Sequence, residues 1–340
     1  MSTVSLRWIR HGACGLLAIA MLWPIAAAVA QDNSQASVRD RVDAVVGVRA
    51  EIPPEARTAG ILGREREGSG VVIDASGLVL TIGYVILEAD YVELFDAEGE
   101  VIIADIVAYD HESGFGIVRA RTALATTPMP LGDPAALEGG DPALVVSRVD
   151  GELAFSPVTL ADRRVFAGYW EYLLEAALFT APAHRAFAGA ALMDAQGSLI
   201  GIGSLFVGDP YGANRAHPGN MFIPIDELEP ILADLLSEGR RSGAVRPWLG
   251  LQIDPSGPLL QTRRVSEDGP AASAGIRPGD IIVGVGGEPV RSLETYLRIL
   301  WAQGVAGDPI TLQILRGAEI VPIEIISGDR YDYLRLDPVY

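Results

Sequence analysis

The amino-acid sequence predicts a mainly β chain, with an antiparallel barrel or sandwich followed by a small α+β domain. The first observation is a turn motif, Asp-Ala-x-Gly, that joins two short apolar runs at three places. The second is a later stretch with helical spacing of apolar residues, after which further strand-like runs follow. The third is length, because a chain of 340 residues is long enough for two or three domains.

The three turns are expected to be tight hairpins, at Asp74–Gly77, Asp96–Gly99 and Asp194–Gly197. Aspartate opens such a turn by accepting hydrogen bonds from nearby backbone, and glycine adopts the left-handed conformation at its exit. Repeated hairpins between short β-branched runs are typical of antiparallel barrels and sandwiches.

The N-terminal segment, residues 1–30, is predicted to be a secretory signal peptide. Arg7 and Arg10 form its basic region, Gly12–Val29 is apolar, and small residues precede the expected cleavage site. The protein is therefore expected in the periplasm, or anchored in the inner membrane if the segment is not cleaved. The single cysteine, Cys14, lies in this segment, so the mature chain is expected to form no disulfide bond.

The first large domain is expected over residues 60–240. An N-terminal leader is expected at 31–59, where Val38–Ala50 fits a helix and a strand equally well. Apolar residues at helical spacing predict a closing helix over Asp226–Arg240. Residues 241–245 then form a short linker.

The second domain is expected over residues 246–328, followed by a C-terminal tail at 329–340. Ser292 is the expected N-cap of its helix, which has apolar residues on one face. Its strands are expected around Leu249–Ile253, Leu259–Val265, Ile281–Val285, Ile310–Leu315 and Ile320–Ile325.

The composition argues against several partners and ligands. A net charge of −18 disfavours nucleic acid and anionic membrane surfaces as partners, so no nucleic acid is expected, nor membrane binding once the signal peptide is removed. The histidines are scattered without metal-ligand spacing, so no metal site is expected. No cofactor is expected either.

Three segments of the first domain carry a family resemblance: Gly68–Ile73, Leu131–Asp141 and Asn220–Ile225. In combination they resemble the protease domain of the HtrA/Deg family of periplasmic, PDZ-containing serine proteases. Gly269–Ile282 and Gly286–Val290 resemble the PDZ domain that follows in that family. The resemblance implies a chymotrypsin/trypsin-like double antiparallel β-barrel followed by a small α+β PDZ domain.

The resemblance also indicates where a catalytic triad would lie, and the triad residues are missing. Tyr84 occupies the histidine position, Gly114 the aspartate position and Ala188 the serine position. A phenol is a poor base at neutral pH, and a methyl group is no nucleophile. His111 and His184 are expected to be exposed loop residues without a catalytic role. No catalytic residue is therefore assigned.

A peptide-binding site is implied in the PDZ domain. Trp248, Leu249, Gly250 and Leu251 match the loop whose backbone N–H groups bind a peptide's terminal carboxylate in HtrA-type PDZ domains. The facing helix would contribute three further side chains, unless these only form the domain core. They are Tyr296, Leu297 and Leu300.

The sequence thus favours a pseudoenzyme of the HtrA/Deg type that binds protein or peptide C-termini through its PDZ domain. It would act as a periplasmic scaffold or regulatory subunit, alone or in a homo- or hetero-oligomer with protease relatives. The alternative is an active serine endopeptidase of protein quality control with a rearranged catalytic site. A holdase-type chaperone without proteolysis is a third hypothesis.

Overall fold

The computed structural model describes residues 39–212, 217–254 and 257–336. The chain from Arg41 to Tyr340 forms one compact unit, and of the unit before it, Met1–Asp40, only residues 39 and 40 are described. The signal peptide predicted for residues 1–30 lies outside the described residues. Within the described ranges, no helix is both long and apolar enough to span a membrane.

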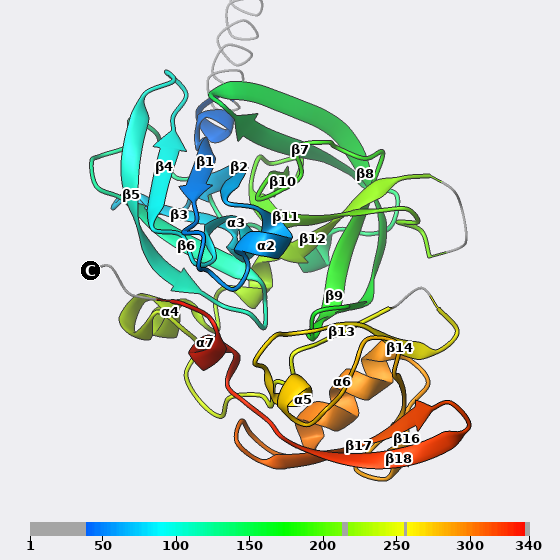
Figure 1. Ribbon diagram of the computed structural model, residues 1–340. Helices are drawn as coiled ribbons and strands as arrows, with labels where there is room; N and C mark the ends of the chain where they lie inside the picture. The colour runs from blue at the N-terminus through cyan, green and yellow to red at the C-terminus, as the bar shows by residue number, and fades with distance from the viewer. Residues whose placement is uncertain (1–38, 213–216, 255–256, 337–340) are drawn as a thin grey trace, which may run out of the picture. The chain divides into compact units, whose positions relative to one another are not determined.

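The N-terminal part of this unit is a closed antiparallel barrel with strand order β1-β2-β3-β6-β5-β4 (Figure 1). Its strands alternate buried and exposed residues where one face meets solvent, as β4 and β5 do. The strands are β1 (Val45–Glu51), β2 (Glu65–Val72), β3 (Leu78–Ile82), β4 (Tyr91–Phe95), β5 (Val101–Tyr109) and β6 (Phe115–Ala120).

The expected leader is wrong in its boundary, because strand β1 lies inside it. Five of the seven β1 residues are buried, and the strand pairs with both β2 and β4, which closes the barrel. The apolar residues Val45, Val46 and Val48 do not alternate with polar residues, as they would in a strand that has one face buried and one face exposed. Burial on both faces explains why this stretch fitted a helix and a strand equally well.

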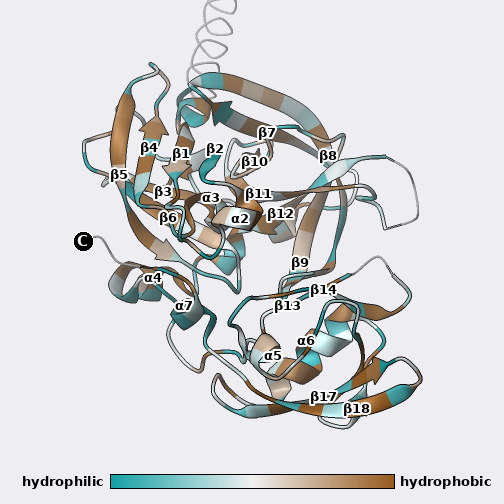
Figure 2. Cartoon of the chain, viewed as in Figure 1, coloured by the Kyte–Doolittle hydropathy of each residue, from teal (hydrophilic) through white to brown (hydrophobic). Residues whose placement is uncertain are grey.

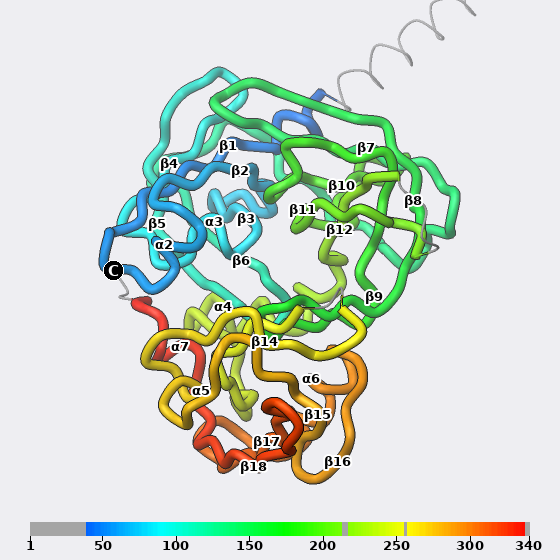
Figure 3. Tube along the Cα trace, turned by 45° about the vertical axis from the view of Figure 1, so that its right-hand side comes forward, coloured from blue at the N-terminus to red at the C-terminus, as the bar shows by residue number. Residues whose placement is uncertain are grey.

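A second closed antiparallel barrel follows, with strand order β10-β11-β12-β9-β8-β7. Strand β8 is long, and the turn that joins it to the start of β9 extends toward the C-terminal domain (Figures 1 and 3). The strands are β7 (Pro142–Val149), β8 (Glu152–Gly168), β9 (Tyr172–Ala181), β10 (Ala191–Met193), β11 (Leu199–Val207) and β12 (Gly219–Pro224).

The three predicted hairpin turns are confirmed, and they join β2 to β3, β4 to β5 and β10 to β11. In the first turn, Asp74 Oδ1 accepts from the N–H groups of Ser76 and Leu78 at 2.8 and 3.0 Å. The exit glycines have left-handed backbones: Gly77, Gly99 and Gly197, with φ of +83°, +80° and +77°.

A hydrophobic core fills both barrels and continues between them. One cluster of buried side chains includes Val46 and Phe115 of the first barrel together with Phe179 and Ile223 of the second. Figure 2 shows the corresponding hydrophobic residues along the strands of both barrels. The two barrels are therefore packed as one body, and the cleft described below lies where they meet.

Short helical segments connect these strands. The closing helix is shorter than predicted: a 3-10 turn, η2 (Ile225–Glu227), precedes α4 (Leu232–Glu238), which ends at Gly239 with a left-handed backbone. The remaining segments are α2 (Ala59–Leu62), α3 (Gly83–Ile86) and the 3-10 turn η1 (Pro134–Ala136).

The C-terminal domain is an antiparallel sheet packed against helix α6 (Leu293–Ala302). Ser292 caps this helix as predicted, because its Oγ accepts from the Thr295 N–H at 3.1 Å. The domain's other elements are β13 (Leu251–Ile253), β14 (Leu260–Val265), α5 (Pro270–Ser273), β15 (Ile281–Val285), β16 (Glu288–Pro289), β17 (Pro309–Arg316) and β18 (Glu319–Ile326).

The segment expected as a tail is structured as far as it is described. It forms α7 (Arg330–Tyr333), capped by Asp329, whose carboxylate accepts from the Tyr331 N–H. Leu334 packs with Leu87 and Tyr109 of the first barrel. The chain after the C-terminal domain therefore returns to the barrel domain.

Candidate functional site

Two of the three positions that the family resemblance assigns to a triad, Tyr84 and Gly114, line one cleft where the barrels meet, and Phe187 beside the third position lines it too. The Gly83 N–H donates to the Gly114 carbonyl at 2.8 Å, which brings α3 and its Tyr84 beside the loop before β6. Tyr84, Gly114 and Phe187 line one pocket of about 350 Å³ with largely aromatic and aliphatic walls. The cleft is present in the fold, so its chemistry depends on the side chains at these positions.

The residue at the histidine position is anchored as a structural side chain. The Tyr84 hydroxyl donates to the Ser204 carbonyl across the cleft at 2.9 Å. Burial raises the pKa of Tyr84 well above its usual value, because the phenolate would lose its hydration. Tyr84 therefore stays protonated and cannot take a proton from a nucleophile at neutral pH.

The residue at the aspartate position cannot readily be replaced by aspartate. Gly114 has a left-handed backbone with φ of +88°, and a Cβ added there would lie 3.1 Å from the Tyr172 hydroxyl. That hydroxyl donates to the Ser113 carbonyl at 2.6 Å, so it is fixed in place. A side chain at position 114 would therefore press against Tyr172 from its first carbon onward.

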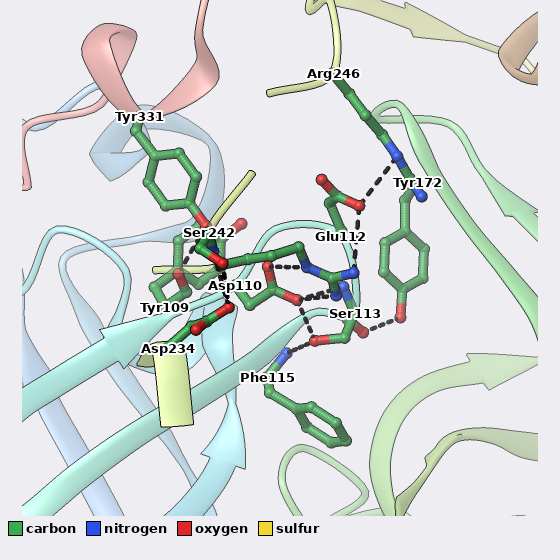
Figure 4. Close-up of polar contacts among 11 residues, drawn as sticks. Tyr109, Asp110, Glu112, Ser113, Phe115, Tyr172, Asp234, Ser242, Arg246 and Tyr331 are labelled. Atoms are coloured by element: carbon green, nitrogen blue, oxygen red, sulfur yellow. Dashed lines mark hydrogen bonds and ion pairs between the residues drawn. The ribbon is translucent and has the colours of Figure 1, made fainter. Parts of the chain in front are cut away.

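A carboxylate does lie nearby, but it is engaged in holding the loop. Asp110 is fully buried and accepts from the Ser113 hydroxyl at 2.6 Å and from Arg241 Nη2 at 2.8 Å (Figure 4). Burial would raise the pKa of Asp110, but the hydrogen bonds and charge of Arg241 outweigh it and lower that pKa. Glu112 extends the network through Arg241 and Arg246. The network is a structural clamp, and no imidazole of the described residues is hydrogen-bonded to its carboxylates.

The nucleophile position holds a methyl group in a tightly packed loop. The Ala188 carbonyl accepts from the Ser69 N–H at 2.8 Å, which ties the loop to β2. Gly189 follows with φ of +70°, and a Cβ there would overlap the Ser69 carbonyl oxygen. The loop keeps its close approach to the first barrel without a hydroxyl to attack a substrate.

The expectation that His111 and His184 are exposed is wrong. Their side chains are buried, with 8% and 5% of the residue surface exposed. His111 Nδ1 has no hydrogen-bond partner among the described residues, and burial, with Arg330 nearby, lowers the pKa of His111 to about 3. Its ring packs edge-on against Tyr331 at a centroid distance of 4.7 Å, so it serves as a neutral packing residue.

His184 lies between two serine hydroxyls in the second barrel. Its Nε2 is 2.8 Å from Ser147 Oγ and its Nδ1 is 2.8 Å from Ser156 Oγ. Asn220 fixes the backbone, since its Oδ1 accepts from the His184 N–H at 2.6 Å. Burial lowers the pKa of His184 and makes it a weaker base. No hydrogen bond or ion pair to a carboxylate is recorded for this ring within the described residues.

The predicted peptide-binding loop is formed in the C-terminal domain, but a carboxylate of the same chain already occupies it. Oε2 of Glu171 accepts from the Leu249 N–H at 3.1 Å, and its Oε1 accepts from the Leu251 N–H at 2.9 Å. Gly250 between them has a left-handed backbone with φ of +79°. Trp248 is buried and pairs with Gly328, which closes the domain.

The three predicted helix residues are core residues in this structure. Tyr296, Leu297 and Leu300 have no exposed surface and belong to the domain's hydrophobic cluster. Leu173 of β9 belongs to the same cluster. The barrel domain therefore contributes a side chain to the core in which these residues are buried, and a direct role in peptide binding stays a prediction.

Sequence reasoning missed Glu171. The signal available was an acidic residue among three aromatic ones, since the turn reads Tyr169, Trp170, Glu171 and Tyr172. Such an aromatic run with one carboxylate between two strands is unusual for a solvent-exposed hairpin tip. Its partner loop is about 80 residues away, as the bonded pairs show separations of 78 and 80.

Metal binding has no support within residues 39–212, 217–254 and 257–336. No group of three or more His, Cys, Asp and Glu side chains in these ranges could hold a metal ion.

These features define the class of protein: a trypsin-like double barrel joined to a PDZ domain. Comparison with known families agrees, because the trypsin-like peptidase domain matches residues 68–202 and the PDZ domain matches residues 261–316. The order of these two domains and the relatives described next support the HtrA family of PDZ-containing serine proteases.

Individual relatives extend over most of the chain. Serine endoprotease DegS of Haemophilus influenzae is 26% identical over 265 residues, which covers 76% of this chain and 76% of the relative. Periplasmic serine endoprotease DegP of Salmonella typhimurium is 27% identical over 277 residues, covering 76% of this chain and 56% of the relative. The solved structure of HtrA-type protease AlgW with a decapeptide has a TM-score of 0.52 at 20% identity, covering 88% of this chain and 99% of that one.

Proposed function

We propose that this chain is a noncatalytic member of the HtrA family that binds peptide or protein C-termini through its PDZ domain. It acts as a scaffold or regulatory subunit. The observation that carries the proposal is that Tyr84, Gly114 and Ala188 stand at the positions that the family resemblance assigns to a triad, with Tyr84 and Gly114 lining the cleft. Acyl transfer needs a nucleophilic hydroxyl, an imidazole and a carboxylate in mutual reach, and Ala188, Tyr84 and Gly114 supply none of these at its own position.

The location of this function is the periplasm. Relatives such as DegP of Salmonella typhimurium are named periplasmic serine endoproteases. The predicted signal peptide at residues 1–30 is consistent with export. Assembly with a second copy or with an active relative is part of the proposal, because a subunit without catalysis acts by binding.

The direct test is labelling of the purified protein with a fluorophosphonate probe, together with casein degradation. We expect neither, and Ala188→Ser alone should restore neither, since the position that the family resemblance assigns to the base holds Tyr84, whose pKa burial raises. Adding Tyr84→His and Gly114→Asp tests the whole triad. The aspartate at 114 meets a left-handed backbone and the Tyr172 hydroxyl, so this triple variant should also remain inactive.

The alternative, an active endopeptidase with a rearranged site, has one observation in its favour. This is the pair of hydroxyls bonded to His184. Ser147 is fully buried, and no recorded bond joins the ring to an orienting carboxylate in the part of the chain that the structure describes. Probe labelling that persists in Ala188→Ser but disappears in Ser147→Ala or Ser156→Ala would establish this alternative and overturn the noncatalytic proposal.

A further inference from the structure

The turn between β8 and β9 departs from an ordinary hairpin. Glu171 has a positive φ of +60°, a conformation that non-glycine residues adopt only when the surroundings fix it. Its side chain is buried, with 6% of the residue exposed, although it stands at a hairpin tip. A buried carboxylate on a strained backbone indicates a specific binding partner for that side chain.

The partner is the loop of the PDZ domain that would bind a terminal carboxylate. Both oxygens of Glu171 are used, one by the Leu249 N–H and the other by the Leu251 N–H. Two residues before Glu171, the Tyr169 carbonyl accepts from the Ile253 N–H of β13 at 3.0 Å. Backbone pairing with this strand plus a carboxylate in the loop is how an extended peptide binds such a domain.

The same hairpin adds a leucine to the apolar cluster of the PDZ domain. Leu173 is buried in one cluster with Leu249, Leu297 and Leu300 of the PDZ domain. At the rim, Arg298 of α6 donates to both oxygens of Glu175 at 2.7 and 2.6 Å. Since the cluster is apolar, a ligand replacing this hairpin needs an apolar side chain beside its carboxylate.

We propose that Glu171 is an internal ligand of the PDZ domain, and that a partner with a free C-terminal carboxylate and an apolar last residue binds only by displacing the β8–β9 turn. This inference rests on the proposed peptide-binding function. It adds that the binding site is closed in the free protein and that a defined residue closes it.

The experiment compares the full-length protein with Glu171→Ala and with the control Glu175→Ala. The probe is a set of fluorescein-labelled decapeptides ending in Leu, Val, Ile or Phe with a free carboxylate, beside the same peptides amidated. The control variant removes the ion pair between Glu175 and Arg298 on the same hairpin but leaves the carboxylate of Glu171 in the PDZ loop. An exposed ion pair contributes at most about 1 kcal/mol to stability, so the affinity of Glu175→Ala for the peptides should stay within about fivefold of wild type.

Glu171→Ala should bind the free-carboxylate peptides roughly tenfold more tightly than wild type or better, because apparent affinity scales with the fraction of open sites. The amidated peptides should bind neither protein. Glu171→Gln, which keeps the size of the side chain and one acceptor oxygen, should give an intermediate affinity. It serves as the test if the alanine variant does not fold.

Two results distinguish failure of the displacement of Glu171 from failure of peptide binding. Equal affinity of wild type and Glu171→Ala for the free-carboxylate peptides would overturn the displacement and leave peptide binding intact. No binding by any variant, with amide exchange at Leu249 and Leu251 accelerated by Glu171→Ala, would overturn peptide binding itself and the displacement with it.

Discussion

The buried carboxyl group of Glu171 should make the protein's stability depend on pH. Burial raises the pKa of Glu171 from an ordinary 4.5 to about 7, although the N–H groups of Leu251, Leu249 and Gly250 and the charge of Arg330 act in the opposite direction. Because the folded-state pKa is raised, the stabilisation is complete below about pH 4.5 and is lost as the pH rises through 7.

The magnitude follows from the size of this shift. Between an unfolded value of 4.5 and a folded value of about 7, one ionisable group changes the free energy of unfolding by about 3 kcal/mol. The neighbouring buried Tyr296 does not titrate in this range, since burial raises its pKa further above 10. The effect therefore belongs to one carboxyl group.

The contribution of the Glu171 carboxyl group to the pH dependence of stability is measured by urea unfolding of wild type and Glu171→Gln between about pH 4.5 and pH 8. Glu112 and Glu227, whose pKa values burial also raises, titrate in both proteins and cancel in the difference. The stability of wild type minus that of Glu171→Gln should fall by about 3 kcal/mol across this range. A difference that does not change with pH would refute the assignment of a buried, titrating Glu171.

Three further changes should alter stability in known directions, each measured by urea or thermal unfolding. Arg241→Ala leaves the buried carboxylate of Asp110 without its charged partner and should lower the free energy of unfolding by about 3 kcal/mol or more. Leu173→Ala removes a buried side chain from the PDZ cluster and should lower it by about 2–4 kcal/mol while increasing peptide access. Gly189→Ala places a Cβ against the Ser69 carbonyl on a left-handed backbone and should prevent a stable fold or lower stability by more than about 2 kcal/mol.

Matched controls distinguish these effects from general sensitivity to mutation. Arg121→Ala removes an exposed pair with Asp105 and should change stability by less than about 1 kcal/mol. Gly99→Ala has a left-handed backbone but open space around its Cβ, so it should be milder than Gly189→Ala. Controls as damaging as the test variants would contradict the structural reasons given for them.

Local chemistry explains which parts of the fold were predictable. The turn at Asp74 is determined by bonds to residues two and four positions away, so its motif is readable in the sequence. The same holds for Ser292, which caps a helix three residues later. Family resemblance located the cleft positions, and the structure brings Tyr84 and Gly114 together at its wall.

Long-range pairing explains what was missed. β1 becomes a barrel strand only because β2 and β4 accept it on both edges. The burial of His184 depends on Ser147, Ser156 and Asn220, which are 28 to 37 residues away. A histidine in a segment rich in small residues gives no sequence signal of such partners.

The β8–β9 turn also connects the two binding surfaces of the molecule. Tyr169, Trp170 and Tyr172 line the cleft that contains Tyr84, while Glu171 between them faces the PDZ loop. A peptide that displaces Glu171 must move residues adjoining it in the chain, so the wall of the cleft changes whenever the PDZ domain is occupied by a partner. In this proposal the cleft has one conformation when Glu171 binds the PDZ loop and another when a peptide has displaced it. A scaffold without catalysis would thus have two conformations that a further partner could tell apart.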